Sequence, residues 1–360
     1  MGRWSALLCA RSSAGIWALG GFSNGEAQKA GFPYPHYNTS RLFLRQTFGL
    51  GGEQETIQDG PLQLAGKVDI SRITVTVGRF FAPDFINNNA YADEPRTTFL
   101  NWAIWNAGAF DFPADQLGYS LGSFVELNQK AWAIRAGYAL QPRESNVNSF
   151  DMQLFGRGAY LVETENRYTL FSQPGKLRLI GWINLAFAGS YAGALDLVAL
   201  NPGLDATDAL DQTRQGRIKY GFVANLEQAI SKEFGIFSRL SWNDGKNEIM
   251  SFTDIDSSLS LGTSLDGHMW GREDDTIGIA GAINALSRDH RDFIAAGGLG
   301  PLIGDGQLNY RRERILEAYY AYALTKQLTL TGDYQFITNP AYNADRGPVS
   351  IFSARLHGEF

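Results

Sequence analysis

The residue types that could carry catalysis are present, but they are not spaced for it. Gly118–Gly122 reads Gly-Tyr-Ser-Leu-Gly and matches the G-x-S-x-G nucleophile elbow, which needs a strand, a sharp turn and then a helix. Here the motif continues into the alternating residues of a strand, including Val125 and Leu127, so it predicts no catalytic role for Ser120. The 4 histidines show no paired metal-ligand spacing. We therefore expect no enzyme, no catalytic residue, no metal site and no cofactor.

The composition indicates a large β-rich protein. The chain has 360 residues, with 44% hydrophobic residues, 13% aromatic residues and 40 glycines, a mixture that suits many strands and turns. The net charge of −6 argues against nucleic acid as a partner. Cys9 is the single cysteine, so an internal disulfide is excluded. The longest promising uncharged stretch, 179–195, alternates in polarity and does not predict a spanning helix.

Short segments of alternating polarity fill most of the chain. In Ile218–Glu227, for example, Tyr220 and Phe222 lie on one face, and Lys219 and Glu227 lie on the other. We count about 13 such strands, separated by alternating short and long connections as in outer-membrane barrels. They are centred on Arg41–Phe48, Arg72–Arg79, Tyr119–Leu127, Trp132–Leu140, Gly158–Asn166, Lys176–Phe187, Arg217–Glu227, Phe234–Asn243, Ser251–Leu261, Thr276–Asn284, Arg314–Leu324, Gln327–Ile337 and Val349–Phe360.

Alternation alone fits either a soluble β-sandwich or a membrane barrel. Two features favour an all-β, transmembrane antiparallel β-barrel. Charges of both signs recur on the polar faces, as a polar lumen needs, and aromatic residues end the apolar faces, as an interfacial girdle needs. The charges are Arg45, Glu126, Arg135, Arg178, Glu227, Arg239, Glu317, Asp333 and Arg355. The aromatic residues are Trp132, Tyr138, Trp242, Tyr320, Tyr322, Tyr334 and Phe360.

The segment Phe81–Gln116 interrupts this rhythm. It is long, rich in Asp and Asn, and has a helix-like centre around Thr97–Asn106. Connections of this length are usually functional. It could be a loop that folds into a pore.

Several stretches resemble the OprB-like family of carbohydrate-selective outer-membrane porins. They include GGFSNGEAQKAG at 20–31, NNNAYADEPRTTFLNWAIWNAGAFDFPAD at 87–115, QPGKLRLIGW at 173–182 and ARLHGEF at 354–360. The resemblance implies passive diffusion of glucose and other small carbohydrates across the bacterial outer membrane. It also implies a 16-stranded porin barrel, of which the about 13 strands found here form the greater part.

The resemblance divides the chain into a non-matching segment, 1–19, and a barrel domain, 20–360. Residues 1–19 match a false start or a remnant signal better than a complete signal peptide. We therefore expect an N-terminally truncated barrel, with Arg41–Phe48 and Val349–Phe360 as its edges, and with either a gap between them or residues 1–38 across it. The expected partners are carbohydrate solutes, outer-membrane lipid and, through the terminal Phe360, the barrel assembly machinery. The oligomeric state stays open.

The resemblance also points to a constriction lined by opposed charges and aromatic rings. Paired charges exchange hydrogen bonds with sugar hydroxyls, and rings face the C–H surfaces of the sugar. The expected solute-contacting residues in and beside the segment are Arg79, Asp84, Asn88, Tyr91, Arg96, Asn101, Trp102, Trp105 and Asp111. The charged residues of the strands are expected to face the lumen, mainly to solvate it.

Two other interpretations remain at this point. A soluble carbohydrate-binding β-protein or glycoside hydrolase could use carboxylates such as Asp84 and Asp111, although nothing in the sequence singles them out. A non-functional porin fragment is the other.

Overall fold

The computed structural model describes residues 3–9 (as backbone), 19–25, 37–60, 62–251, 253–304 and 306–359. Of the described strands, 14 form one antiparallel sheet in the order β1-β16-β15-β14-β13-β12-β11-β10-β9-β8-β7-β6-β5-β2, and two more form a separate hairpin. The strands are β1 (Arg3–Cys9), β2 (Leu42–Gly49), β5 (Arg72–Phe80), β6 (Ser120–Asn128), β7 (Trp132–Ala139), β8 (Gly158–Leu170), β9 (Gln173–Ala188), β10 (Gln215–Ala229), β11 (Phe234–Asn243), β12 (Ser257–Asp266), β13 (Thr276–Ala285), β14 (Glu313–Ala323), β15 (Leu328–Thr338) and β16 (Val349–Glu359).

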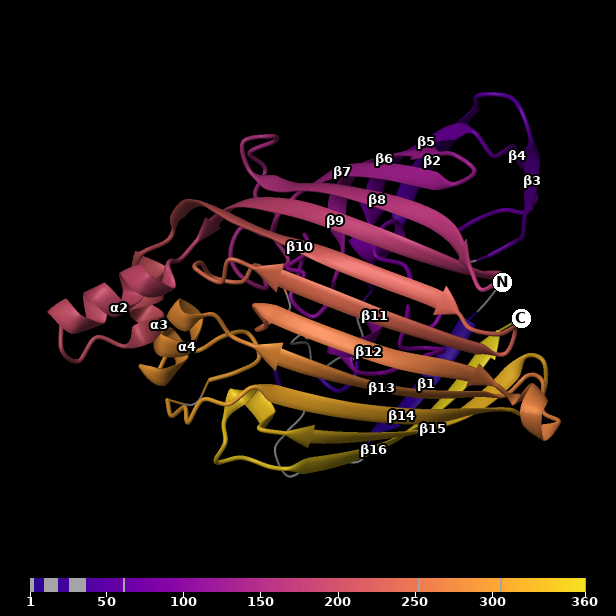
Figure 1. The fold of residues 1–360 in the computed structure, drawn as a ribbon. Coiled ribbons are helices and arrows are strands. Elements are labelled where there is room, and N and C mark those ends of the chain that lie inside the picture. The colour runs from indigo at the N-terminus through magenta and orange to yellow at the C-terminus, as the bar shows by residue number, and fades with distance from the viewer. Residues whose placement is uncertain are drawn as a thin grey trace.

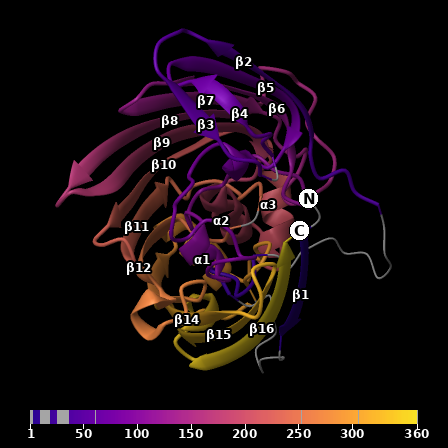
Figure 2. The ribbon, with the colours of Figure 1, turned by 90° about the vertical axis from the view of Figure 1, so that its right-hand side faces the viewer.

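The sheet curves around an interior, as the view along the strands shows (Figure 2). The 13 strands from β2 and β5 to β16 correspond to the predicted segments. No ladder between described strands joins β1 to β2, so the sheet is not closed there. The predicted free edge at Val349–Phe360 is wrong, because the backbone of β1 pairs with β16 from Arg3↔Glu359 to Cys9↔Ser353 and satisfies its hydrogen-bonding groups. Phe360 lies outside the described residues.

The two ends of the sheet differ in their connections (Figure 1). At one end, tight turns such as Phe171–Ser172 join neighbouring strands, and the hairpin of β3 (Gln54–Ile57) and β4 (Gly66–Asp69) extends the β2–β5 connection. At the other end, long connections carry the helices. These are α2 (Tyr191–Leu200), α3 (Ala206–Gln212) and α4 (Arg288–Ala295), with 3-10 turns η1 (Ala82–Asp84) and η3 (Pro340–Tyr342). The 3-10 turn η2 (Gly267–Trp270) lies at the tight-turn end.

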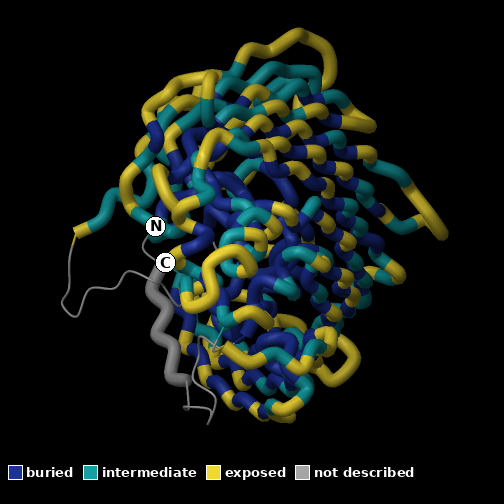
Figure 3. Tube along the Cα trace, turned by 90° about the vertical axis from the view of Figure 1, so that its left-hand side faces the viewer, coloured by how far each residue is buried: buried dark blue, intermediate teal, exposed yellow. Residues whose placement is uncertain are grey.

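The sheet is polar inside and apolar outside. Buried and exposed residues alternate along the strands (Figure 3). Large apolar side chains such as Ile134, Leu179 and Ile279 are exposed, whereas charged side chains such as Glu163 and Arg239 are buried. A soluble sandwich has the opposite distribution, because water drives its apolar face inward. This pattern suits a sheet that faces lipid outside and a filled lumen inside.

One strand begins later than its sequence pattern indicated. The predicted strand Ser251–Leu261 begins only at Ser257, the start of β12. The backbone N–H groups of Met250 and Ser251 instead donate to the carboxylate of Asp111, at 3.1 and 3.0 Å. These residues of the β11–β12 connection therefore bind the end of the long segment Phe81–Gln116 and do not pair with a neighbouring strand.

No helix among the described residues is long and apolar enough to cross a membrane.

Candidate functional site: the inward segment and the vestibule

The segment Phe81–Gln116, called the inward segment below, lies inside the curve of the sheet and carries the short helix α1 (Trp102–Trp105) (Figure 2). Its apolar side chains form part of the main core, where Phe99 packs on Phe237 and Tyr319. The rings of Trp102 and Trp105 meet edge to face at 5.1 Å. The segment thus fills much of the interior.

Charged side chains of the strands hold the backbone of the inward segment. Glu317 accepts hydrogen bonds from the N–H groups of Leu100 (2.5 Å) and Asn101 (3.0 Å), at the start of α1. Glu163 accepts from the N–H of Asn87 at 2.7 Å. Glu227 accepts from the N–H of Ala90 at 2.8 Å. Each carboxylate satisfies backbone donors that the loop cannot satisfy itself.

Strand cations bind the carbonyl groups of the same segment. Arg239, which is 1% exposed, donates to the carbonyls of Ile104 (2.9 Å) and Ala92 (2.5 Å). Arg355 donates to the carbonyls of Pro95 and Thr98. These charged residues of the strands bind the backbone of the inward segment.

The predicted constriction residues separate into two groups. Asn101, Trp102, Trp105 and Asp111 are buried. The amide of Asn101 caps α1 by accepting from the N–H of Ala103 at 3.0 Å. These four side chains lie in the contacts that fix the shape of the segment.

The remaining members of that set are half-buried or exposed. Arg79 pairs with Asp115 at 2.5 Å, and Asp84 pairs with Arg41 at 2.7 Å, both near the long-connection end of β5. Tyr91 and Arg96 are half-buried, and Asn88 is exposed. Only Asn88 of the predicted constriction set lines the principal polar cavity.

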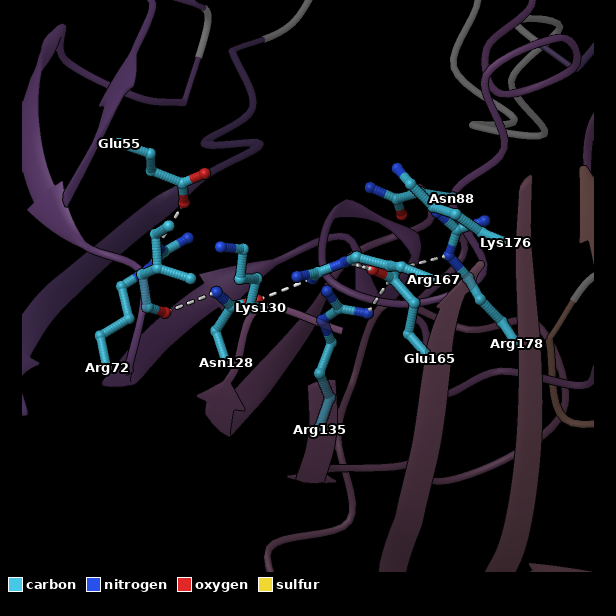
Figure 4. Close-up of a pocket in the computed structure, with 11 residues that line it drawn as sticks. Glu55, Arg72, Asn88, Asn128, Lys130, Arg135, Glu165, Arg167, Lys176 and Arg178 are labelled. Carbon is cyan, nitrogen blue, oxygen red and sulfur yellow. Dashed lines mark hydrogen bonds and ion pairs between the residues drawn. The ribbon is translucent and has the colours of Figure 1, made fainter. Parts of the chain in front are cut away.

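This cavity, called the vestibule below, has a volume of about 530 Å³ and lies at the tight-turn end (Figure 4). Its wall carries two carboxylates, Glu55 and Glu165, and six cations: Arg72, Lys130, Arg135, Arg167, Lys176 and Arg178.

Three arginines converge on Glu165 in the vestibule (Figure 4). Arg167 and Arg178 each donate through Nε at 2.7 Å, and Nη1 of Arg135 donates at 3.2 Å. Arg135 also pairs with Glu126 at 2.5 Å. The sequence analysis did not single out Glu165 or Arg167, although Glu163 and Glu165 are two carboxylates on one face of a strand, a signal available from spacing alone.

The other predicted wall residues lie elsewhere on the inner face. Arg45, near the open edge, donates to the carbonyl of Leu62 at 2.9 Å and lies over the rings of Phe43 and Phe85. Asp333 is buried and accepts from Gln335 at 3.3 Å. The hydroxyl of Ser120, in the G-x-S-x-G match, donates to the carbonyl of Leu140 at 2.6 Å from within β6, so the motif lacks the helix that a nucleophile elbow needs.

Comparison with known proteins identifies the family of this sheet and its inward segment. The family described as "Carbohydrate-selective porin, OprB family" matches residues 13–360. The chain belongs to the OprB family of carbohydrate-selective porins. Membership implies a bacterial outer-membrane location and carbohydrate solutes, and porins of this kind are typically non-enzymatic. No curated protein matches the chain.

The fold resembles that of a solved porin structure. The high-pH structure of Pseudomonas putida OprB has 16% sequence identity and a TM-score of 0.60, over 80% of this chain and 70% of that one. The low-pH structure of the same protein has 14% identity and a TM-score of 0.44, over 80% and 62%. The outer-membrane channel DcaP of Acinetobacter baumannii has 8% identity and a TM-score of 0.47, over 99% and 95%. The chain thus spans 70% and 62% of the two OprB structures.

Proposed function

We propose that the chain is an integral outer-membrane β-barrel that admits glucose and other small neutral carbohydrates by passive diffusion. The solute moves down its gradient through the interior, and the inward segment narrows its path. Outer-membrane lipid surrounds the exposed apolar face. The observation that carries the proposal is the segment Phe81–Gln116, held inside the sheet by charged side chains of the wall.

The charge balance of the vestibule supports a neutral solute. Its six cations have six carboxylate partners among the described ion pairs: Glu53, Glu55, Glu126, Glu163, Glu165 and Glu227. A balanced network excludes neither sign by net charge. It offers both donors and acceptors, so a polyhydroxylated solute can exchange its bonds to water for bonds to the wall.

We assign the predicted constriction residues two roles. The first role is contact with the solute, and it falls to the half-buried or exposed residues Arg79, Asp84, Asn88, Tyr91 and Arg96. The buried Asn101, Trp102, Trp105 and Asp111 fix the position of the segment, so their effect on selectivity is indirect.

Removal of Asn87–Asn106 tests the constriction. The variant should form a wider path, because this stretch contains α1 and most of the contacts to the wall carboxylates. Proteoliposomes containing it should swell faster in glucose, and planar bilayers should show a larger single-channel conductance. Equal conductance and equal sugar flux in the variant and the parent chain would contradict the proposal.

A deletion outside the inward segment provides the control. Residues 201–204 join α2 to α3 at the long-connection end, outside the inward segment. Removing them should leave glucose-driven swelling unchanged. Heat-modifiable mobility on gels reports whether each variant retains a folded sheet.

A further inference from the structure

Cations outnumber carboxylates on the wall of the vestibule. Six cations but only two carboxylates line it. Glu163, which pairs with Arg135 at 2.6 Å, has a fully buried side chain, and the side chain of Glu227, which pairs with Arg178 at 3.0 Å, is 6% exposed. The lining of the vestibule therefore carries more cations than carboxylates.

Two of the three arginines around Glu165 keep part of their surface open: the side chains of Arg135 and Arg167 are 14% and 28% exposed, whereas that of Arg178 is 4% exposed. A guanidinium carries five N–H donors. The bonds recorded for Arg135, Arg167 and Arg178 number two or three each. Carboxylates bind arginine in pairs of parallel, charge-assisted hydrogen bonds, which are stronger than bonds to a neutral hydroxyl.

We infer that the vestibule binds sugar acids, such as a uronate or an aldonate, more tightly than the matching neutral sugars. The hydroxyls use the same donors in both classes, and only the acid adds a carboxylate to the cationic surface. The volume of about 530 Å³ lies within the range of small-molecule sites. This inference rests on the proposed sugar channel and extends its solutes to a second class.

Equilibrium binding of glucuronate and glucose to the full chain in detergent tests the preference. Glucuronate should bind about 3–10 times more tightly at low ionic strength, a difference of the size expected for one charge-assisted contact. The preference should shrink at about 1 M salt, because screening shortens the range of the attraction to roughly 3 Å. Equal dissociation constants at low salt would overturn the inference.

Two substitutions, one that removes a cation and one that removes a carboxylate, test whether glucuronate binds in the vestibule. Arg167→Gln removes a vestibule cation and should weaken glucuronate binding by about threefold or more, with a smaller change for glucose. Glu55→Gln removes a carboxylate whose side chain is 43% exposed on the β3–β4 hairpin, and it should strengthen glucuronate binding. A structural defect cannot produce opposite shifts, so shifts of the same sign would also overturn the inference.

A distant charge provides the matched control. Arg288 lies on α4 at the long-connection end, with a side chain that is 84% exposed. Arg288→Gln changes the net charge as Arg167→Gln does and should leave both affinities unchanged; an equal loss would show that net charge, not the vestibule, sets the preference. Liposome swelling separates the two proposals. If glucose enters the liposomes but glucuronate binds no more tightly than glucose, only this inference is refuted. If glucose does not enter, the proposed channel is refuted, and the ratio of the two dissociation constants still tests whether the vestibule prefers sugar acids.

Discussion

Two glutamates on β8, two residues apart and on the same face of the sheet, have different partners. Glu163 is fully buried, and its carboxylate accepts from the backbone N–H of Asn87 in the inward segment. Glu165 lines the vestibule and is bound by three arginines. Both side chains are buried, but one carboxylate binds the backbone of the inward segment and the other binds the arginines of the vestibule.

The difference shows why the inward segment needs a charged wall. A loop inside a barrel cannot leave its N–H and C=O groups unpaired, since each buried unpaired group costs about 1–3 kcal/mol. Glu317, Glu163 and Arg239 supply those partners. In the vestibule, by contrast, the carboxylate of Glu165 pairs with three arginine side chains.

Among the substitutions that test this difference, Arg239→Met should have the largest effect on stability and conductance. The substitution keeps much of the side-chain volume but removes donors to carbonyls of the inward segment at Ile104 and Ala92. We expect a loss of about 3 kcal/mol or more, since hydrogen bonds to charged groups are worth about 1.5–3 kcal/mol each. The thermal midpoint of the heat-modifiable form should fall, and single-channel conductance should rise.

Arg217→Met is the control for that variant. Arg217 also donates to two backbone carbonyls, those of Ala188 and Thr213, but both lie outside the inward segment. Its loss should lower stability without raising conductance. If both variants raise conductance equally, wall arginines do not act through the inward segment.

Most of the fold could be predicted from sequence, because alternation is a local signal. Each strand repeats with period two, and the 13 predicted segments correspond to strands. The start of β12 was predicted too early, because residues near Ser251 bind Asp111, a partner 140 positions away. The helices α2, α3 and α4 were not predicted, since they lie in long polar connections without a strong periodic pattern.

The candidate site could be predicted only in part. The alternation placed charged residues on the inner face, but it could not show which of them meet water. That depends on where the inward segment folds, and its contacts join distant positions such as Leu100 and Glu317. The predicted aromatic pair Trp102 and Trp105 is buried for the same reason, since the segment packs its rings into the core.

Separate replacement of the two β8 glutamates tests the difference between the inward segment and the vestibule, because each substitution removes one negative charge. Arg135 and the N–H of Asn87 donate to different oxygens of Glu163, and Glu163→Gln replaces one of these oxygens by an NH2 donor, so it should lower the thermal midpoint and raise conductance. Glu165→Gln leaves three arginines without their shared carboxylate and should shift the reversal potential toward anion selectivity. Identical changes in both measurements would contradict the division between segment and vestibule.

Asp93→Asn should have the smallest effect, and that effect should depend on pH. Asp93 lies in the inward segment, where loss of hydration raises the pKa of its carboxyl to about 6 despite the nearby charge of Arg239 and the N–H of Asn89. An unfolded chain titrates Asp near about 4. The folded state therefore holds the proton more tightly, and this stabilisation is present below about pH 4 and is lost as the pH rises through about 6.

Asparagine cannot ionise and keeps an oxygen that can accept from Asn89, so Asp93→Asn should be more stable than the parent chain at pH 7.5 and nearly equal to it at pH 4. The surrounding protein removes part of the hydration of Asp93, but the residue remains exposed and solvent screens its charge, so we expect a gain below about 1 kcal/mol. Thermal midpoints of the heat-modifiable form at the two pH values measure it. A gain of the same size at both would mean that the carboxyl of Asp93 acts by its shape and not by its charge.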